Sequence, residues 1–105
     1  MLKIVYADID KLSSEKEREI YSVLPLSRQK KADLYVYPSD RKLSLAASYL
    51  LHQELEKLGI NDSSLETDLN GKPFIPDSDI NISMSHSGNI SFVAISDKKV
   101  GVDVQ

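Results

Sequence analysis

The sequence predicts an α+β fold in which one long helix and shorter helices pack on a small antiparallel sheet. Residues 39–58 carry apolar side chains at three- and four-residue spacing, as an amphipathic helix does. After Gly59 the apolar positions alternate, which is typical of half-buried strands. Helices early in the chain and strands late in it favour a helical layer on one sheet. A length of 105 residues fits a single domain, residues 1–105.

The first third of the chain predicts one strand followed by two short helices. Residues 2–7 are apolar at both alternating sets of positions, so we expect a strand with two apolar faces. Ser13 and the glutamates after it indicate an N-cap and an acidic first turn, and this helix should run to about Val23. Pro25 interrupts it, and Ser27 is the expected cap of the second helix.

The long helix should begin after Pro38, with Ser39 as its N-cap, and end at Gly59. A short strand over 65–69 and a turn at Asn70-Gly71 should follow. The remaining alternating segments predict an antiparallel meander. Its strands are expected at residues 80–84, 90–95 and 100–104.

Composition narrows the class of protein. The chain has no cysteine, which excludes disulfides, a thiol nucleophile and cysteine-ligated metals. No apolar run approaches the roughly 18 to 20 residues of a membrane span, and the start lacks the apolar core of a signal peptide. We therefore expect a cytoplasmic protein that has no membrane partner.

The net charge of −3 hides a basic segment over residues 28–42, which holds five basic and two acidic residues. Such a cluster is either a solvated helix face or an anion site. A nucleic-acid site is disfavoured, because the whole chain is acidic and Tyr35 and Tyr37 are the only aromatics among these cations.

His86 lies between two serines where a strand meets a turn. A serine–histidine nucleophile pair is disfavoured, because adjacent residues on a strand point to opposite faces, which separates Ser85 from His86. Phosphate binding needs only donors, and hydroxyl, imidazole and turn N–H groups supply them. At the end of the chain, Asp103 and Gln105 share one strand face and can present two oxygen ligands to one magnesium ion.

Three motifs resemble those of a known enzyme family. They are Asn70-Gly71-Lys72-Pro73, residues 81–88 (NISMSHSG) and Gly101-Val102-Asp103-Val104-Gln105. In this order and spacing they resemble the N-terminal half of surfactin-synthetase-type 4′-phosphopantetheinyl transferases. The family moves the phosphopantetheine arm of coenzyme A to a serine of an acyl or peptidyl carrier protein, uses magnesium and releases 3′,5′-ADP.

The resemblance implies a fold that is one half of a pseudo-dimeric transferase, with the active site between two similar halves. It implies that Asp103 is the catalytic magnesium ligand, assisted by Gln105. The remaining expected site residues contact the phosphates of coenzyme A. They are Arg28, Lys31, Arg41, Ser44, Lys72, Ser85 and His86.

Two departures from the family pattern shape the expected activity. Gln105 stands where the family has glutamate, so it adds no negative charge to hold a metal. The second half of the family enzyme has no counterpart in these residues. We therefore expect weak transfer or none from the 105 residues alone, and a homodimer as one way to rebuild two halves. A module that binds coenzyme A or a carrier protein without catalysis is the alternative.

Overall fold

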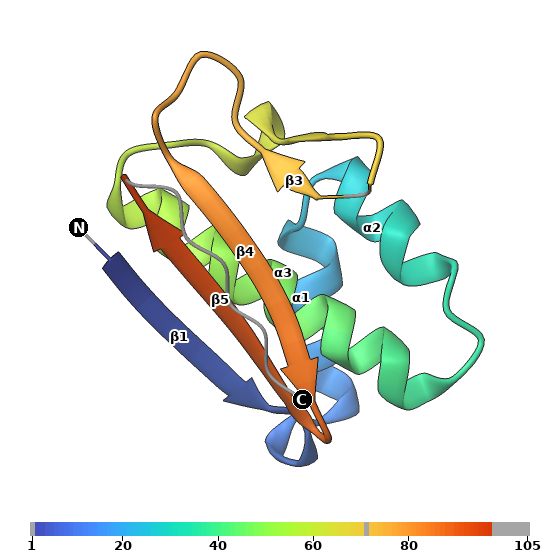
Figure 1. The fold of residues 1–105 in the computed structure, drawn as a ribbon. Coiled ribbons are helices and arrows are strands. Elements are labelled where there is room, and N and C mark those ends of the chain that lie inside the picture. Colours follow the sequence, from blue (N-terminus) through green and yellow to red (C-terminus); the bar gives the residue numbers. More distant parts are fainter. Residues whose placement is uncertain (1, 71, 98–105) are drawn as a thin grey trace.

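The computed structural model describes residues 2–70 and 72–97, and these form an α+β fold (Figure 1). The helix α3 packs on a three-stranded antiparallel sheet, and the shorter helices α1 and α2 pack on α3. The elements in chain order are β1 (Leu2–Asp8), η1 (Ile9–Lys11), α1 (Ser14–Val23), α2 (Leu26–Asp33), α3 (Pro38–Lys57), η2 (Asp62–Ser64), β2 (Glu66–Thr67), β3 (Pro73–Phe74), β4 (Asn81–Ser87) and β5 (Ile90–Ser96).

The sheet has the strand order β1-β5-β4, so the first strand joins the last described one. The expected hairpin of β4 and β5 is confirmed, and its turn holds Gly88 at a φ of 55°, where glycine is favoured. The second neighbour of β5 is β1, which pairs with it along its whole length. The strand expected at 100–104 lies outside the described residues.

The helix boundaries follow the caps and prolines of the sequence with two corrections. Ser13 caps α1 as expected, and its hydroxyl accepts the N–H of Lys16 at 3.1 Å. Ser27 caps nothing, because α2 begins at Leu26 after Pro25. Ser39 is likewise not a cap. The long helix already begins at Pro38, whose fixed φ suits the first helical position and whose missing N–H needs no partner there.

Most of the core lies between α3 and the sheet. Leu51 and Leu55 of α3 are fully buried and belong to one cluster with Val93 and Ile95 of β5. A second cluster joins the other side of α3 to the short helices, where Leu45 meets Ala32 of α2. The long helix is therefore packed on two sides, and it fixes where α2 stands relative to the sheet.

A polar contact fixes the chain that follows α3. His52 Nδ1 lies 2.8 Å from the Asp62 carboxylate, which is almost entirely buried. This contact ties η2 to the helix, and η2 leads into the β2–β3 hairpin that carries Lys72. The side chain of His52 is 27% exposed and lies at the boundary of the core.

None of the helices formed by residues 2–70 and 72–97 combines the length and the apolar character needed to cross a lipid bilayer.

We predict that the ion pair between β1 and α3 gives the fold a pH-dependent part of its stability. The Lys3 ammonium lies 2.8 Å from the Glu54 carboxylate. Its hydrogen bond to this carboxylate holds the pKa of Glu54 below the usual 4.5. A carboxyl whose pKa is lower in the folded state than in the unfolded state stabilises the fold at pH values above the unfolded-state pKa. This stabilisation is lost as the pH falls through the folded-state pKa. Glu54→Gln should therefore lower the free energy of unfolding by up to about 1 kcal/mol at pH 7, because the half-exposed Lys3 is screened by solvent.

Urea denaturation at pH 7 and at pH 3 measures this difference. The gap between the wild type and Glu54→Gln should close at the acidic pH. Glu66→Gln, at an exposed position of β2, is the matched control and should change neither value. A gap of equal size at both pH values would contradict the prediction.

Candidate anion-binding site

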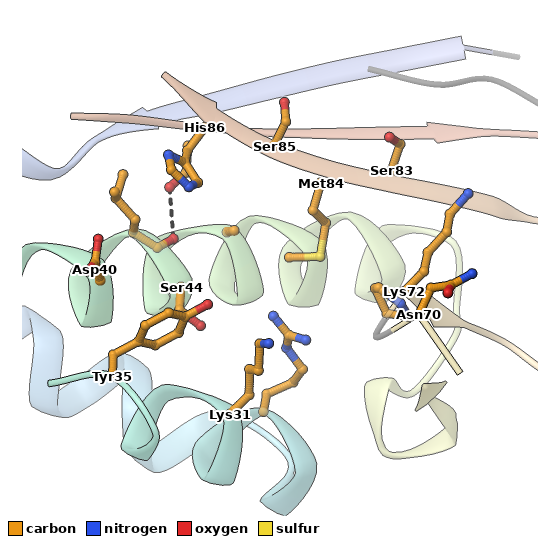
Figure 2. A pocket seen from close by; sticks show the side chains of 15 residues that line it. Lys31, Tyr35, Asp40, Ser44, Asn70, Lys72, Ser83, Met84, Ser85 and His86 are labelled. Atoms are coloured by element: carbon orange, nitrogen blue, oxygen red, sulfur yellow. Dashed lines mark hydrogen bonds between the residues drawn. The ribbon is translucent and has the colours of Figure 1, made fainter. Parts of the chain in front are cut away.

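A cavity of about 460 Å³ opens between α2, α3, β4 and the β2–β3 connection (Figure 2). Its wall combines cationic and hydroxyl-bearing side chains with an apolar floor. The lining residues are Arg28, Lys31, Tyr35, Asp40, Leu43, Ser44, Ala47, Asn70, Lys72, Pro73, Ser83, Met84, Ser85, His86 and Ser91. Six of the seven residues expected at a phosphate site are among them.

The helix α2 supplies two cations on one face. Arg28 and Lys31 are three residues apart, so both side chains turn toward the cavity, while Ala32 is buried against α3. Lys31 Nζ lies 5.8 Å from the centre of the Tyr35 ring, which is a cation–π distance. Tyr35 itself follows α2 and lines the cavity.

Arg28 is the most constrained of these cations. It is only 9% exposed, and its Nε donates a 2.8 Å hydrogen bond to the hydroxyl of Ser48 on α3. Burial lowers the pKa of the guanidinium, because the charged form loses water. No carboxylate of the described residues forms an ion pair with it. Within residues 2–70 and 72–97, this buried positive charge therefore has no counter-charge.

A turn places the third cation at the opposite end of the cavity. The Asp68 carboxylate accepts the backbone N–H groups of Asn70 and Lys72, both at 2.9 Å. This side-chain-to-backbone bonding is typical of aspartate in tight turns. The side chains of Asn70 and Lys72 consequently border the cavity across from α2 (Figure 2).

The side chains of β4 alternate between the two faces of the strand. Figure 2 shows the Met84 thioether and the Ser85 hydroxyl on opposite sides of the strand. The expected separation of Ser85 and His86 follows from the same alternation. Ser85 lines the cavity, but its Oγ is buried and makes no hydrogen bond among the described residues. The side chains of Met84 and His86 therefore lie on one side of β4, and the Ser85 hydroxyl lies on the other side.

Arg41 is the expected site residue that the structure does not bring to this cavity. Its Nη1 lies 2.8 Å from the Asp33 carboxylate and its Nε lies 3.5 Å from that of Glu17. Its guanidinium also lies over the ring of Tyr21, which donates a hydrogen bond to Asp33. The carboxylates at the ends of α1 and α2 thus draw Arg41 into a contact between helices.

The expected magnesium ligands Asp103 and Gln105 lie outside the described residues. Across residues 2–70 and 72–97, no three acidic or histidine side chains gather into a metal site. The cavity contains one carboxylate, that of Asp40. The described wall otherwise presents cations and hydrogen-bond donors, and these groups suit an anion.

Sequence reasoning missed Tyr35, Asp40, Ser48, Asn70 and Met84. Ser48 had a signal, because Ser44 and Ser48 are four residues apart and interrupt an apolar helix face. A buried hydroxyl there needs a polar partner. The partner of the Ser48 hydroxyl depends on how α2 packs on α3, and this packing cannot be predicted from the sequence.

We predict that Asp40→Asn strengthens anion binding at the cavity. Asp40 forms no ion pair with the described residues and shares the cavity with three cations. Removing one negative charge there should raise the affinity for pyrophosphate by about three- to tenfold, on the order of 1 kcal/mol of Coulomb energy. Calorimetric titration measures it. Glu15→Gln removes the same charge outside the cavity and should leave the affinity unchanged, while equal effects of both variants would contradict the prediction.

We predict different roles for Arg41 and Lys31. Arg41→Ala removes the bonds to Asp33 and Glu17 and should lower the free energy of unfolding by about 1 kcal/mol. Its effect on pyrophosphate affinity should stay within about twofold. Lys31→Ala should reverse the pattern, with affinity falling about tenfold and little change in stability. Denaturation and titration of both variants test this. A larger loss of affinity in Arg41→Ala than in Lys31→Ala would contradict the prediction and indicate that Arg41 contacts the ligand.

The geometry defines what this arrangement can bind. Two cations on α2 and one on the β2–β3 connection face a shared cavity, with hydroxyl, amide and imidazole donors between them. Such a set suits a ligand that carries several phosphate oxygens. In comparisons with known proteins, neither a family model nor a curated protein matches the chain.

Proposed function

We propose that this chain binds coenzyme A through its phosphates as the N-terminal half of a 4′-phosphopantetheinyl transferase. The transferase moves phosphopantetheine to a serine of an acyl or peptidyl carrier protein and releases 3′,5′-ADP. One structural observation supports the binding step: at the cavity, Arg28 carries a buried charge that no carboxylate of the described residues pairs with. The motifs at 70–73 and 81–88, which supply Lys72 and His86 to the same cavity, point to the substrate.

Burial of the Arg28 guanidinium costs free energy in the protein without a ligand. A cation removed from water is strongly destabilised unless an anion or several acceptors replace its hydration. The guanidinium of Arg28 has a single hydroxyl partner, Ser48, and otherwise faces a cavity. A phosphate in the cavity offsets this cost with charge-assisted hydrogen bonds, which are about twice as strong as neutral ones.

The remaining groups then have distinct roles in the proposal. Lys31 and Lys72 approach the phosphates from opposite walls, and they offset the negative charge that develops on the leaving 3′,5′-ADP. Ser44 and His86 donate hydrogen bonds. Magnesium belongs to the proposal through Asp103 and Gln105, where it would offset charge on the pyrophosphate.

A second candidate is a module that binds coenzyme A or a carrier protein without transfer. The cavity favours it in one respect, since its described wall holds binding groups but only one carboxylate, Asp40. Mass spectrometry of a carrier protein incubated with coenzyme A, magnesium and this chain separates the two. A modified carrier serine supports the transferase, and tight binding without modification supports the module.

We predict that Arg28→Met abolishes most coenzyme A binding without destabilising the free protein. The variant removes a charge-assisted contact, so affinity should fall at least tenfold. It also removes an uncompensated buried charge, so the free energy of unfolding without ligand should stay equal or rise by about 1 kcal/mol. Titration calorimetry with coenzyme A and urea denaturation give the two values.

The control for this variant is Arg18→Met, which removes the same charge from α1 and should alter neither value. Titration of the wild type with dephospho-coenzyme A shows whether the 3′-phosphate contributes to affinity. A wild-type chain that binds neither coenzyme A nor pyrophosphate at millimolar concentration would overturn the proposed function.

A further inference from the structure

Ser48 is a polar residue in an otherwise apolar part of α3. It is 2% exposed, and Leu45, Ala46, Ala47 and Leu51 around it in the sequence are all buried. Serine is a weaker helix former than alanine, and a buried hydroxyl needs a hydrogen bond to offset its lost hydration. If this residue only packed in the core, alanine would stabilise the helix more than serine does.

The hydroxyl of Ser48 has a specific partner. It accepts a hydrogen bond from Arg28 Nε at 2.8 Å, and both residues are buried. A guanidinium is planar and carries five N–H donors in a fixed fork. One bond at Nε therefore restricts the plane of the whole group and leaves the four terminal N–H donors available for a ligand.

The contact is not what holds α2 on α3. Ala32 of α2 is fully buried with Leu45 of α3 in an apolar cluster that also contains Ile20 and Leu24. Arg41 and Asp33 add an ion pair between the two helices. Since α2 has these independent attachments, the bond from Arg28 to Ser48 can act on the orientation of the arginine rather than on the docking of the helix.

We propose that Ser48 is a positioning residue that fixes the Arg28 guanidinium for bidentate binding of a phosphate group in the cavity. The role rests on the proposed function, because it needs a phosphorylated ligand there. Ser48 does not contribute to the cavity wall and acts through Arg28 alone. A side chain as long as arginine loses much rotamer freedom when it binds, and holding it in advance reduces that loss.

The role predicts a pattern among three substitutions at position 48. Ser48→Ala should lower the affinity for coenzyme A and for pyrophosphate by about five- to tenfold, since Arg28 is no longer oriented. Ser48→Thr keeps the hydroxyl and should stay within about twofold of the wild type. Ser48→Cys keeps the size of the side chain but offers only a weak acceptor, so it should behave like Ser48→Ala.

A double-mutant cycle separates positioning from a general structural effect. In the Arg28→Met background, Ser48→Ala should cause no further loss of pyrophosphate affinity, because the group it orients is absent. Circular dichroism and urea denaturation of each variant establish that the fold is kept. If Ser48→Ala proves unfolded, the cycle is run with Ser48→Cys.

Each result bears on one of the two proposals. Binding by the wild type with unchanged affinity in Ser48→Ala and Ser48→Cys would overturn the role of Ser48 and leave the proposed function standing. Equal losses from Ser48→Ala in the wild-type and Arg28→Met backgrounds would also overturn it. A wild-type chain that binds neither coenzyme A nor pyrophosphate overturns the proposed function and the role of Ser48 together.

Discussion

The packing of α3 on the sheet is the constraint on which the rest of the structure depends. Leu51 and Leu55 are fully excluded from water against Val93 and Ile95, and burial of such side chains is the main favourable term in folding. The same helix holds α2 on its other side through Leu45 and Ala32. One helix thereby sets the distance between the cations of α2 and the strand β4, and so the width of the cavity.

The cavity contains a cation whose burial carries a desolvation cost. Arg28 is buried with one hydroxyl partner and no carboxylate partner among the residues that the structure describes. By contrast, the buried carboxylate of Glu54 is paired with Lys3. The contrast suits a site whose counter-charge arrives with its ligand. The proposed function assigns phosphate binding to the cavity residues and metal binding to Asp103 and Gln105.

The two arginines of the basic segment show why position in the sequence does not settle a role. Arg28 and Arg41 both belong to the basic segment over residues 28–42, yet only Arg28 of the two borders the cavity. Arg41 lies within reach of the carboxylates of Glu17 and Asp33 and pairs with both. An ion pair forms with the nearest available carboxylate, and proximity is decided by how three helices pack.

Local signals in the sequence determined the long helix, the cap at Ser13, the hairpin of β4 and β5 and the opposite orientation of Ser85 and His86, because each depends on the periodicity or capping of neighbouring residues. Only the tertiary structure decided the pairing of β1 with β5 and the partners of Arg41 and Ser48. These contacts join residues far apart in the chain. Their geometry depends on which faces of the helices and strands pack against one another. Local periodicity and capping do not specify this packing.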